Sequence, residues 1–162
     1  MRKYGIARGT FPILALTLVR VALAVFWLSQ LGWKPPPTFG CPDGGLCLWF
    51  DRQIQYPFVP AYADLVSTLI RPNVLVFGWL VALLEAAIGG SLLLGVLTRL
   101  GGFLGMLWSL VILIAMVAVP GETVWYYFSL VLLDFLFFAI GGSTQVSVDL
   151  VVRSRTWWAE AE

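Results

Sequence analysis

Four long apolar runs dominate the pattern of hydrophobic and polar positions. They cover approximately residues 11–32, 73–97, 100–119 and 123–140. Each run is long enough to cross a hydrocarbon core of ~30 Å at ~1.5 Å per helical residue. The runs are continuous and do not alternate, which favours helices over a transmembrane barrel. The pattern therefore predicts an all-α protein, a four-transmembrane-helix bundle that forms one integral membrane domain over residues 1–162.

The connections between these runs differ in length. The second and third runs meet at LTRLGG and the third and fourth at PGET, whereas a long outer loop of residues 33–72 joins the first two. Late in that loop Tyr62, Leu65, Val66 and Leu69 share one helical face. That spacing predicts a short helix, which either lies on the membrane surface or packs as an ordinary loop helix.

Composition supports the membrane class. The chain is 60% hydrophobic and 12% charged, whereas roughly a quarter of the residues of a soluble domain are charged. The net charge of +1 excludes a basic surface for nucleic acid. The chain has no histidine, the usual haem and zinc ligand, and its two cysteines are too few for an iron–sulfur cluster. The chain therefore shows no haem or metal motif, and no flavin motif is visible either.

The distribution of lysine and arginine predicts the orientation. If the four runs cross a membrane, more lysine and arginine residues lie on one side of it than on the other. The richer side carries Arg2, Lys3, Arg8, Arg99, Arg153 and Arg155. The other carries Lys34, Arg52 and Arg71. The richer side is expected to be cytoplasmic. This predicts a multi-pass protein of the inner (plasma) membrane, with both termini cytoplasmic and the cysteine-bearing loop outside.

Three ionisable residues, Arg20, Glu85 and Asp134, interrupt the apolar runs. Counted from the outer ends of their runs, all three lie roughly 16 to 18 Å deep at ~1.5 Å per residue. Charges that face lipid are costly, so these side chains should point inward and interact. We expect Arg20 and Glu85 to form a bidentate pair. Asp134 adds a second carboxylate, so one of the two acids should keep its proton.

This arrangement has two interpretations. A salt bridge that fixes which helices adjoin would be purely structural. A polar pocket that binds a head group or passes protons would be functional, and the third charge favours it. Arg20, Glu85 and Asp134 are therefore the candidate catalytic residues.

The two cysteines, Cys41 and Cys47, flank the turn sequence PDGGL. A turn can bring their Cα atoms within disulfide range, and the outer side of the membrane favours oxidation. We expect a structural disulfide. The alternative is a redox pair that exchanges electrons with a quinone, although the chain has no CxxC motif and no second cysteine pair.

Several segments resemble one known family. RVALAVFWLSQLGWK is similar to the first-helix signature of the DoxX/DoxD family, GWLVALLEAAIGGSLLLGVLTRLGG to its second signature, and IGGSTQVSVDL to its closing segment. The loop with YPFVPAYADLV most resembles DoxD, the small membrane subunit of thiosulfate:quinone oxidoreductase. The resemblance implies a four-helix membrane protein that is often partnered and is sometimes linked to quinone reduction. Its family-type positions here are Arg20, Lys34, Glu85, Arg99 and Asp149.

The first functional hypothesis is a subunit of a quinone-linked oxidoreductase in the bilayer. Arg20 would donate to a quinone carbonyl, while Glu85 and Asp134 would carry protons. Lys34 and Arg71 would attract an anion, such as a small sulfur oxyanion, from outside. Because no electron-carrying cofactor motif is visible, other membrane or exported subunits would supply the electrons.

Two alternatives stay open. The chain could be a non-catalytic accessory subunit of a larger respiratory or photosynthetic membrane complex, with buried charges that only hold the bundle together. A weaker alternative is a disulfide–quinone oxidoreductase that uses Cys41 and Cys47.

Overall fold

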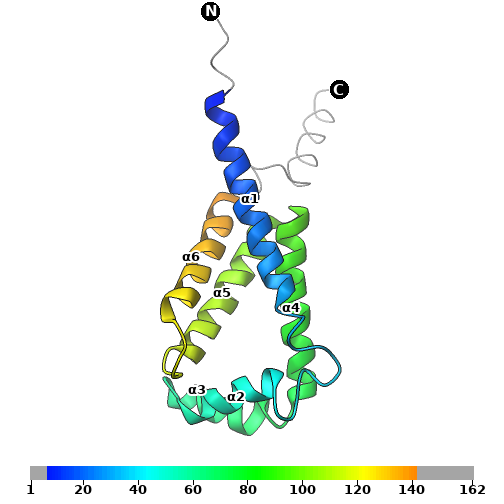
Figure 1. Cartoon of the computed structure of the whole chain (residues 1–162), viewed down its shortest axis with the longest axis vertical. Helices are drawn as coiled ribbons and strands as arrows, with labels where there is room; N and C mark the ends of the chain where they lie inside the picture. Colours follow the sequence, from blue (N-terminus) through cyan, green and yellow to red (C-terminus); the bar gives the residue numbers. More distant parts are fainter. Residues whose placement is uncertain (1–6, 142–162) are drawn as a thin grey trace, which may run out of the picture.

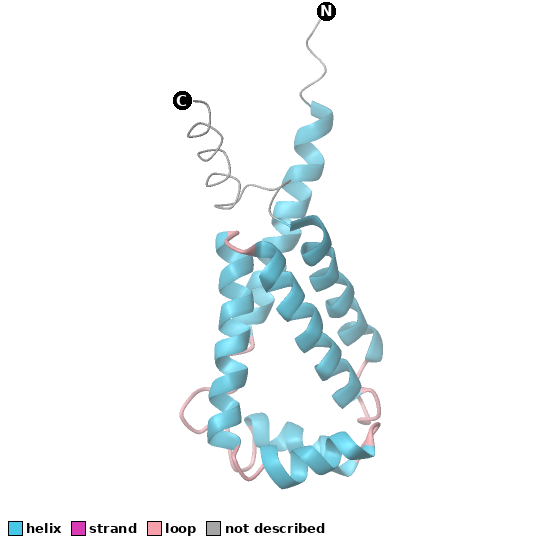
Figure 2. Cartoon of the chain, turned by 180° about the vertical axis from the view of Figure 1, so that it is seen from behind, coloured by secondary structure: helices cyan, strands magenta, loops and turns pink. Residues whose placement is uncertain are grey.

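The computed structural model describes residues 7–141, with side chains from residue 13 onward, and this part of the chain is helical without a strand (Figures 1 and 2). The all-α class is thus confirmed. The elements are α1 (Ala7–Ser29), α2 (Gly45–Gln55), α3 (Pro60–Leu65), the π-helical turn η1 (Val66–Ile70), α4 (Val74–Leu94), α5 (Thr98–Met116) and α6 (Val124–Ile140).

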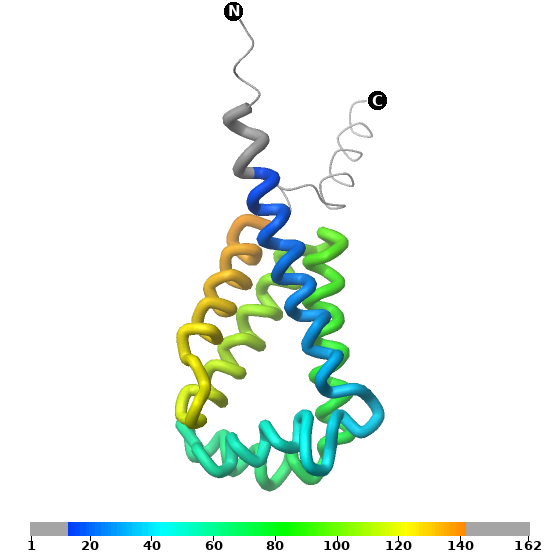
Figure 3. The backbone as a smooth tube through the Cα atoms, in the orientation of Figure 1, coloured from blue at the N-terminus to red at the C-terminus, as the bar shows by residue number. Residues whose placement is uncertain are grey.

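The four long helices form two pairs. Helix α1 packs on α4 and α5 packs on α6, while α4 also contacts α5. The two pairs lie close together at one end of the molecule and diverge toward the other, where α2 and α3 lie across the opening (Figures 1 and 3). The outer loop therefore folds into a cap over the wide end of the bundle.

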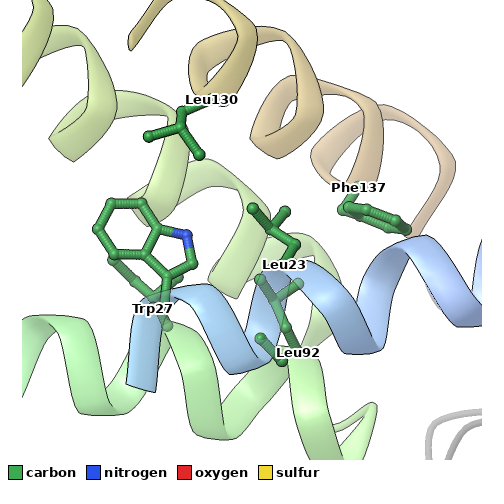
Figure 4. Packing of buried hydrophobic residues seen from close by; sticks show 7 residues of the cluster. Leu23, Trp27, Leu92, Leu130 and Phe137 are labelled. Atoms are coloured by element: carbon green, nitrogen blue, oxygen red, sulfur yellow. The ribbon is translucent and has the colours of Figure 1, made fainter. Parts of the chain in front are cut away.

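Small residues allow the helices to approach each other closely. An added Cβ at Gly102 of α5 would collide with the α6 backbone at Phe137 and Phe138, and one at Gly89 of α4 would lie 3.1 Å from the carbonyl oxygen of Ala24 in α1. Such contacts are typical of tightly packed membrane helices. They enclose a core of buried hydrophobic residues, several of which are labelled in Figure 4: Leu23, Ala24, Trp27, Ile88, Leu92, Leu130 and Phe137.

The turn between α4 and α5 is locally encoded. Gly95 ends α4 in the left-handed conformation, with φ of 67°, where glycine carries no Cβ penalty. The Ser91 hydroxyl donates to the carbonyl oxygen of Val96 at 2.6 Å and so holds the chain as it leaves the helix. The predicted short connection is confirmed, but it lies at residues 95–97, and the part of LTRLGG after Leu97 belongs to α5 (Thr98–Met116).

The outer loop is more ordered than its sequence pattern suggested. The predicted disulfide between Cys41 and Cys47 is present, with the Cα atoms 5.3 Å apart. It closes the turn that leads into α2, a helix that the sequence analysis did not predict. Helix α2 packs Leu46 and Phe50 into a second hydrophobic cluster with Phe39.

The predicted short helix exists as α3 and η1, but its expected apolar face is wrong. Val66 is fully buried in the second cluster and Tyr62 packs against it, so the helix is packed on one side. Leu65 and Leu69 instead face outward, 46% and 48% exposed. The reason is that the second cluster buries the side that carries Tyr62 and Val66, whereas Leu65 points about 100° away from its neighbour Val66 around the helix axis.

The apolar surface indicates association with a membrane. By length and composition, α4 and α5 are each able to cross a bilayer, and the described apolar parts of α1 and α6 are shorter. Each of the four long helices also exposes large hydrophobic side chains, for example Leu18, Leu83, Leu107 and Leu132. Exposed apolar surface on this scale marks a membrane or protein contact.

Candidate ligand cavity and its two buried acids

A cavity of about 560 Å³ lies where the two helix pairs diverge. Its wall includes residues from all four long helices and from α2 and α3 of the cap. Aromatic side chains make up much of the wall, including the tryptophans Trp27, Trp33, Trp49 and Trp108. A cavity of this size and composition is typical of a site for a small apolar ligand.

A buried ion pair forms the polar part of the wall. Lys34 Nζ donates to Glu85 Oε1 at 2.6 Å, and both side chains, each 3% exposed, line the cavity. The indole nitrogen of Trp108 lies 3.5 Å from the same oxygen. The second carboxylate oxygen, Glu85 Oε2, is buried and has no hydrogen-bond partner among the described residues. The pair therefore has one acceptor to spare.

Lys34 reaches this position because α1 ends early. The helix ends at Ser29, and hydrogen-bonded turns over Gln30 to Gly32 redirect the chain. Lys34 then lies over the ring of Trp33, with its Nζ 4.5 Å from the ring centroid. Burial lowers the pKa of Lys34, and the adjacent Glu85 carboxylate opposes that shift. The carboxylate is thus the partner that makes a charged lysine tolerable in this wall.

The predicted bidentate pair between Arg20 and Glu85 is wrong. One oxygen of Glu85 accepts from Lys34 and Trp108, and the other accepts no hydrogen bond from the described residues. Arg20 is buried but does not line the cavity. The prediction failed because it placed Lys34 outside the bundle, beyond an α1 that was drawn three residues too long.

Asp134 of α6 forms a separate polar cluster. Its side chain is fully buried, Trp27 Nε1 donates to Oδ1 at 3.2 Å and Ser109 Oγ donates to Oδ2 at 2.8 Å. Gly105 makes the space, because an added Cβ there would lie 2.7 Å from Cγ of Asp134. The carboxylate therefore links α1, α5 and α6, and it does not line the cavity.

Glu85 and Asp134 lie at a similar level, but the predicted common layer of three interacting charges is not formed. Glu85 contacts Trp108 and Asp134 contacts Ser109, which are neighbours on α5, so the acids lie at nearly the same level. Neighbouring residues point about 100° apart around a helix, however, so the acids occupy different sides of α5. Arg20 precedes Trp27 by seven residues, or ~10 Å of helix at ~1.5 Å per residue. A single pocket of three charges is not formed.

The predicted anion-binding residues do not form one site either. Lys34 is buried in the ion pair with Glu85, whereas Arg71 makes two hydrogen bonds to the Asp51 carboxylate, at 2.8 and 3.2 Å. Arg99 donates to the carbonyl oxygen of Ala139 at 3.3 Å. Each of these cations is therefore engaged by a group of the chain itself.

Polar contacts also join the cap to the bundle at the cavity rim. Arg52 of α2 lies 4.0 Å from Glu122, which accepts a hydrogen bond from Tyr127 of α6. Within the cap, Tyr62 of α3 donates to Gln53 of α2 at 3.0 Å. The lining residues Gln53, Glu122 and Tyr127 and the cavity's tryptophans were not predicted as site residues. The aromatic content of 15% was the available signal, but it does not say which rings converge.

Some predicted residues cannot be placed. Asp149 and the terminal basic residues Arg2, Lys3, Arg153 and Arg155 lie outside the described residues. Neither Cys41 nor Cys47 lines the cavity. Among the described residues, no group of three or more acids and cysteines is arranged to hold a metal ion.

The chain matches no protein-family model, no curated protein and no solved structure.

Proposed function

We propose that the protein is an integral membrane subunit of a quinone-linked oxidoreductase, and that its cavity binds the head group of a lipid-soluble quinone. The observation that carries the proposal is the aromatic cavity of about 560 Å³ with the Lys34–Glu85 pair in its wall. The size lies within the range of small-molecule sites, roughly 300 to 1,000 Å³.

The membrane arrangement follows from the four long helices, which in this proposal all cross the inner membrane. Support comes from the hydrophobic side chains that α1, α4, α5 and α6 expose and from the burial of Arg20, Glu85 and Asp134. Polar side chains inside a bilayer point away from lipid. The lysine and arginine bias would put both termini in the cytoplasm and the disulfide-bearing cap outside.

The chemistry of the wall suits both redox forms of a quinone. A quinone ring is flat and apolar and stacks on aromatic side chains. An ammonium has three N–H donors, so Lys34 keeps donors for a quinone carbonyl after bonding Glu85. Glu85 Oε2 is a buried acceptor without a partner among the described residues, so it can accept from the hydroxyl of the reduced quinol. Lys34 and Glu85 thus replace the proposed trio of Arg20, Glu85 and Asp134.

The resemblance to the DoxX/DoxD family supports the same site. Lys34 and Glu85 are both family-type positions, and here they bond each other. The proposal assigns electron delivery to a partner subunit, because the sequence carries no recognisable electron-carrying cofactor motif. Recognition of a sulfur oxyanion is assigned to that partner as well, since Lys34 and Arg71 each bond an acid of the chain.

A second candidate is the non-catalytic accessory subunit. The observation that favours it is the Asp134 cluster, which ties three helices together away from the cavity. In that case the cavity would hold a structural lipid or a segment of a partner, and quinone would not bind.

The test is whether the protein purified in mild detergent binds quinone saturably. A short-chain quinone is titrated in, and binding is measured by the quenching of tryptophan fluorescence. The double variant Lys34→Met/Glu85→Leu removes both charges together, which keeps a buried pair from leaving one ion alone. We expect its affinity to fall by about tenfold or more, since a hydrogen bond to a charged group contributes ~1.5–3 kcal/mol.

The matched control is Arg71→Met, which breaks an ion pair on the surface of the cap and should leave the affinity unchanged. Absence of saturable binding to the wild-type protein, and of quinone in the purified material, would overturn the proposal.

A further inference from the structure

We infer that Asp134 is a positioning residue of the cavity: its carboxylate holds the indole N–H of Trp27 and so fixes the ring that forms part of the cavity wall. The inference rests on the proposed function, because it concerns a fully buried residue that packs in the wall of the cavity where the quinone would bind. It assigns a task to a buried acid that the Lys34–Glu85 chemistry does not use.

The first step is the position of Trp27 itself. Its side chain belongs to the core between the helix pairs, and Figure 4 shows the indole reaching from α1 toward Leu130 of α6. The same residue is part of the cavity wall. A tryptophan ring has one polar atom, and a buried indole N–H needs an acceptor. Here Asp134 Oδ1 is that acceptor, at 3.2 Å.

The second step is that Asp134 is itself held in place. Ser109 donates to its other oxygen at 2.8 Å, and the absence of a side chain at Gly105 leaves the space that the carboxyl group occupies. These two features therefore fix one orientation of the carboxylate. An acceptor with a fixed orientation selects one orientation of the indole, because hydrogen bonds weaken steeply when they bend.

The third step is that Asp134 acts through Trp27 and not on the ligand. It is fully buried and does not line the cavity, whereas Glu85 does. The positioning role needs a hydrogen-bond acceptor at this place but not a titrating group. The positioning role therefore differs from the proton-carrying role that was predicted for Asp134. Replacement by asparagine distinguishes the two roles, because its side-chain amide keeps a hydrogen-bond acceptor but does not titrate as a carboxyl group does.

The experiment compares Asp134→Asn with Asp134→Leu by quinone affinity in detergent. In the asparagine variant the carbonyl oxygen can accept from Trp27 while the amide donates to the Ser109 hydroxyl. We expect Asp134→Asn to bind within about threefold of wild type and Asp134→Leu to bind about tenfold more weakly or worse. If Asp134→Asn loses as much as Asp134→Leu, or if Asp134→Leu loses nothing, the inference is overturned.

A double-mutant cycle distinguishes positioning from general packing. Trp27→Phe keeps an aromatic ring but removes the N–H, so Asp134→Leu should cause little further loss in that background. An equal loss with and without the indole N–H would contradict the inference. Should Asp134→Leu fail to fold, Trp27→Phe reports the same bond from its other side, and unchanged affinity in that variant would count equally against it.

A readout without ligand keeps this test separate from the proposed function. In ¹⁵N-tryptophan-labelled protein, the indole resonance of Trp27 is the one lost in Trp27→Phe. It should shift in Asp134→Leu and stay near its wild-type position in Asp134→Asn. If the wild-type protein binds no quinone but this pattern holds, the proposed function fails and the bond stands. If quinone binds and the resonance ignores Asp134→Leu, only the positioning role fails.

Discussion

Two buried carboxylates of this protein lie at nearly the same level and have opposite surroundings. Glu85 bonds a lysine, lines the cavity and keeps one oxygen without a partner in the described structure. Asp134 has both oxygens bonded by neutral donors and lies behind the cavity wall. Adjacent residues of α5, Trp108 and Ser109, contact the two acids. The difference shows that the depth of a carboxylate in the bundle does not decide its role. The side chains that surround it decide whether it lines the cavity or is enclosed by hydrogen-bond donors.

The largest effect should come from separating the ion pair. Lys34→Met leaves Glu85 buried in the wall without a cation, so we expect a loss of about 3–5 kcal/mol in the free energy of unfolding. Lys34→Met/Glu85→Leu should recover most of that loss, because no buried charge is left alone. Unfolding in mixed micelles measures both. A double variant as unstable as the single one would show that the charges themselves hold the fold.

A middle-sized effect should come from filling the space beside Asp134. Gly105→Ala places a methyl group against the carboxyl group, and such overpacking costs about 1–3 kcal/mol. The matched control is Gly90→Ala in α4, where an added Cβ has no neighbour within 4 Å and alanine gains about 0.5–1 kcal/mol of helix propensity. Thermal unfolding in detergent should move the two variants in opposite directions. Equal shifts would mean that the Asp134 side is not tightly packed.

The smallest effects should come from removing a single hydrogen-bond donor from each of the two acids. Ser109→Ala removes a hydrogen bond of 2.8 Å to Asp134, and we expect a loss of about 1 kcal/mol. Trp108→Phe removes only a long contact of 3.5 Å to Glu85 and keeps the ring, so its loss should be smaller. Denaturant titration compares the two. A larger loss for Trp108→Phe would reverse the assignment of which acid depends on neutral donors.

Features set by short stretches of chain were predictable. The disulfide follows from PDGGL between Cys41 and Cys47, and the four long helices follow from their apolar length, with ends displaced by a few residues. Helix α2 was missed because it has only 11 residues and follows a stretch rich in proline and glycine. The face of α3 and η1 was wrong because tertiary packing buries only the side that carries Tyr62 and Val66.

The candidate site was only partly predictable. Glu85 was named as a site residue, and Lys34 was named for a different task. The tryptophans of the cavity wall were not predicted, since rings at Trp27 and Trp108 look like any aromatic residues of an apolar helix. Rotation of each helix about its axis decides which side chains meet, and a run that is apolar all round carries little information on that rotation.

The sequence by itself determined that this chain is helical, apolar enough to associate with a membrane, and obliged to bury several charges. Only the tertiary structure decided the partners of those charges. Lys34 and Glu85 are 51 positions apart, and Trp27 and Asp134 are 107 apart. The cost of burying an ion acts wherever it lies in the chain, but its partner depends on where another helix ends and how the chain turns back, which no local pattern encodes.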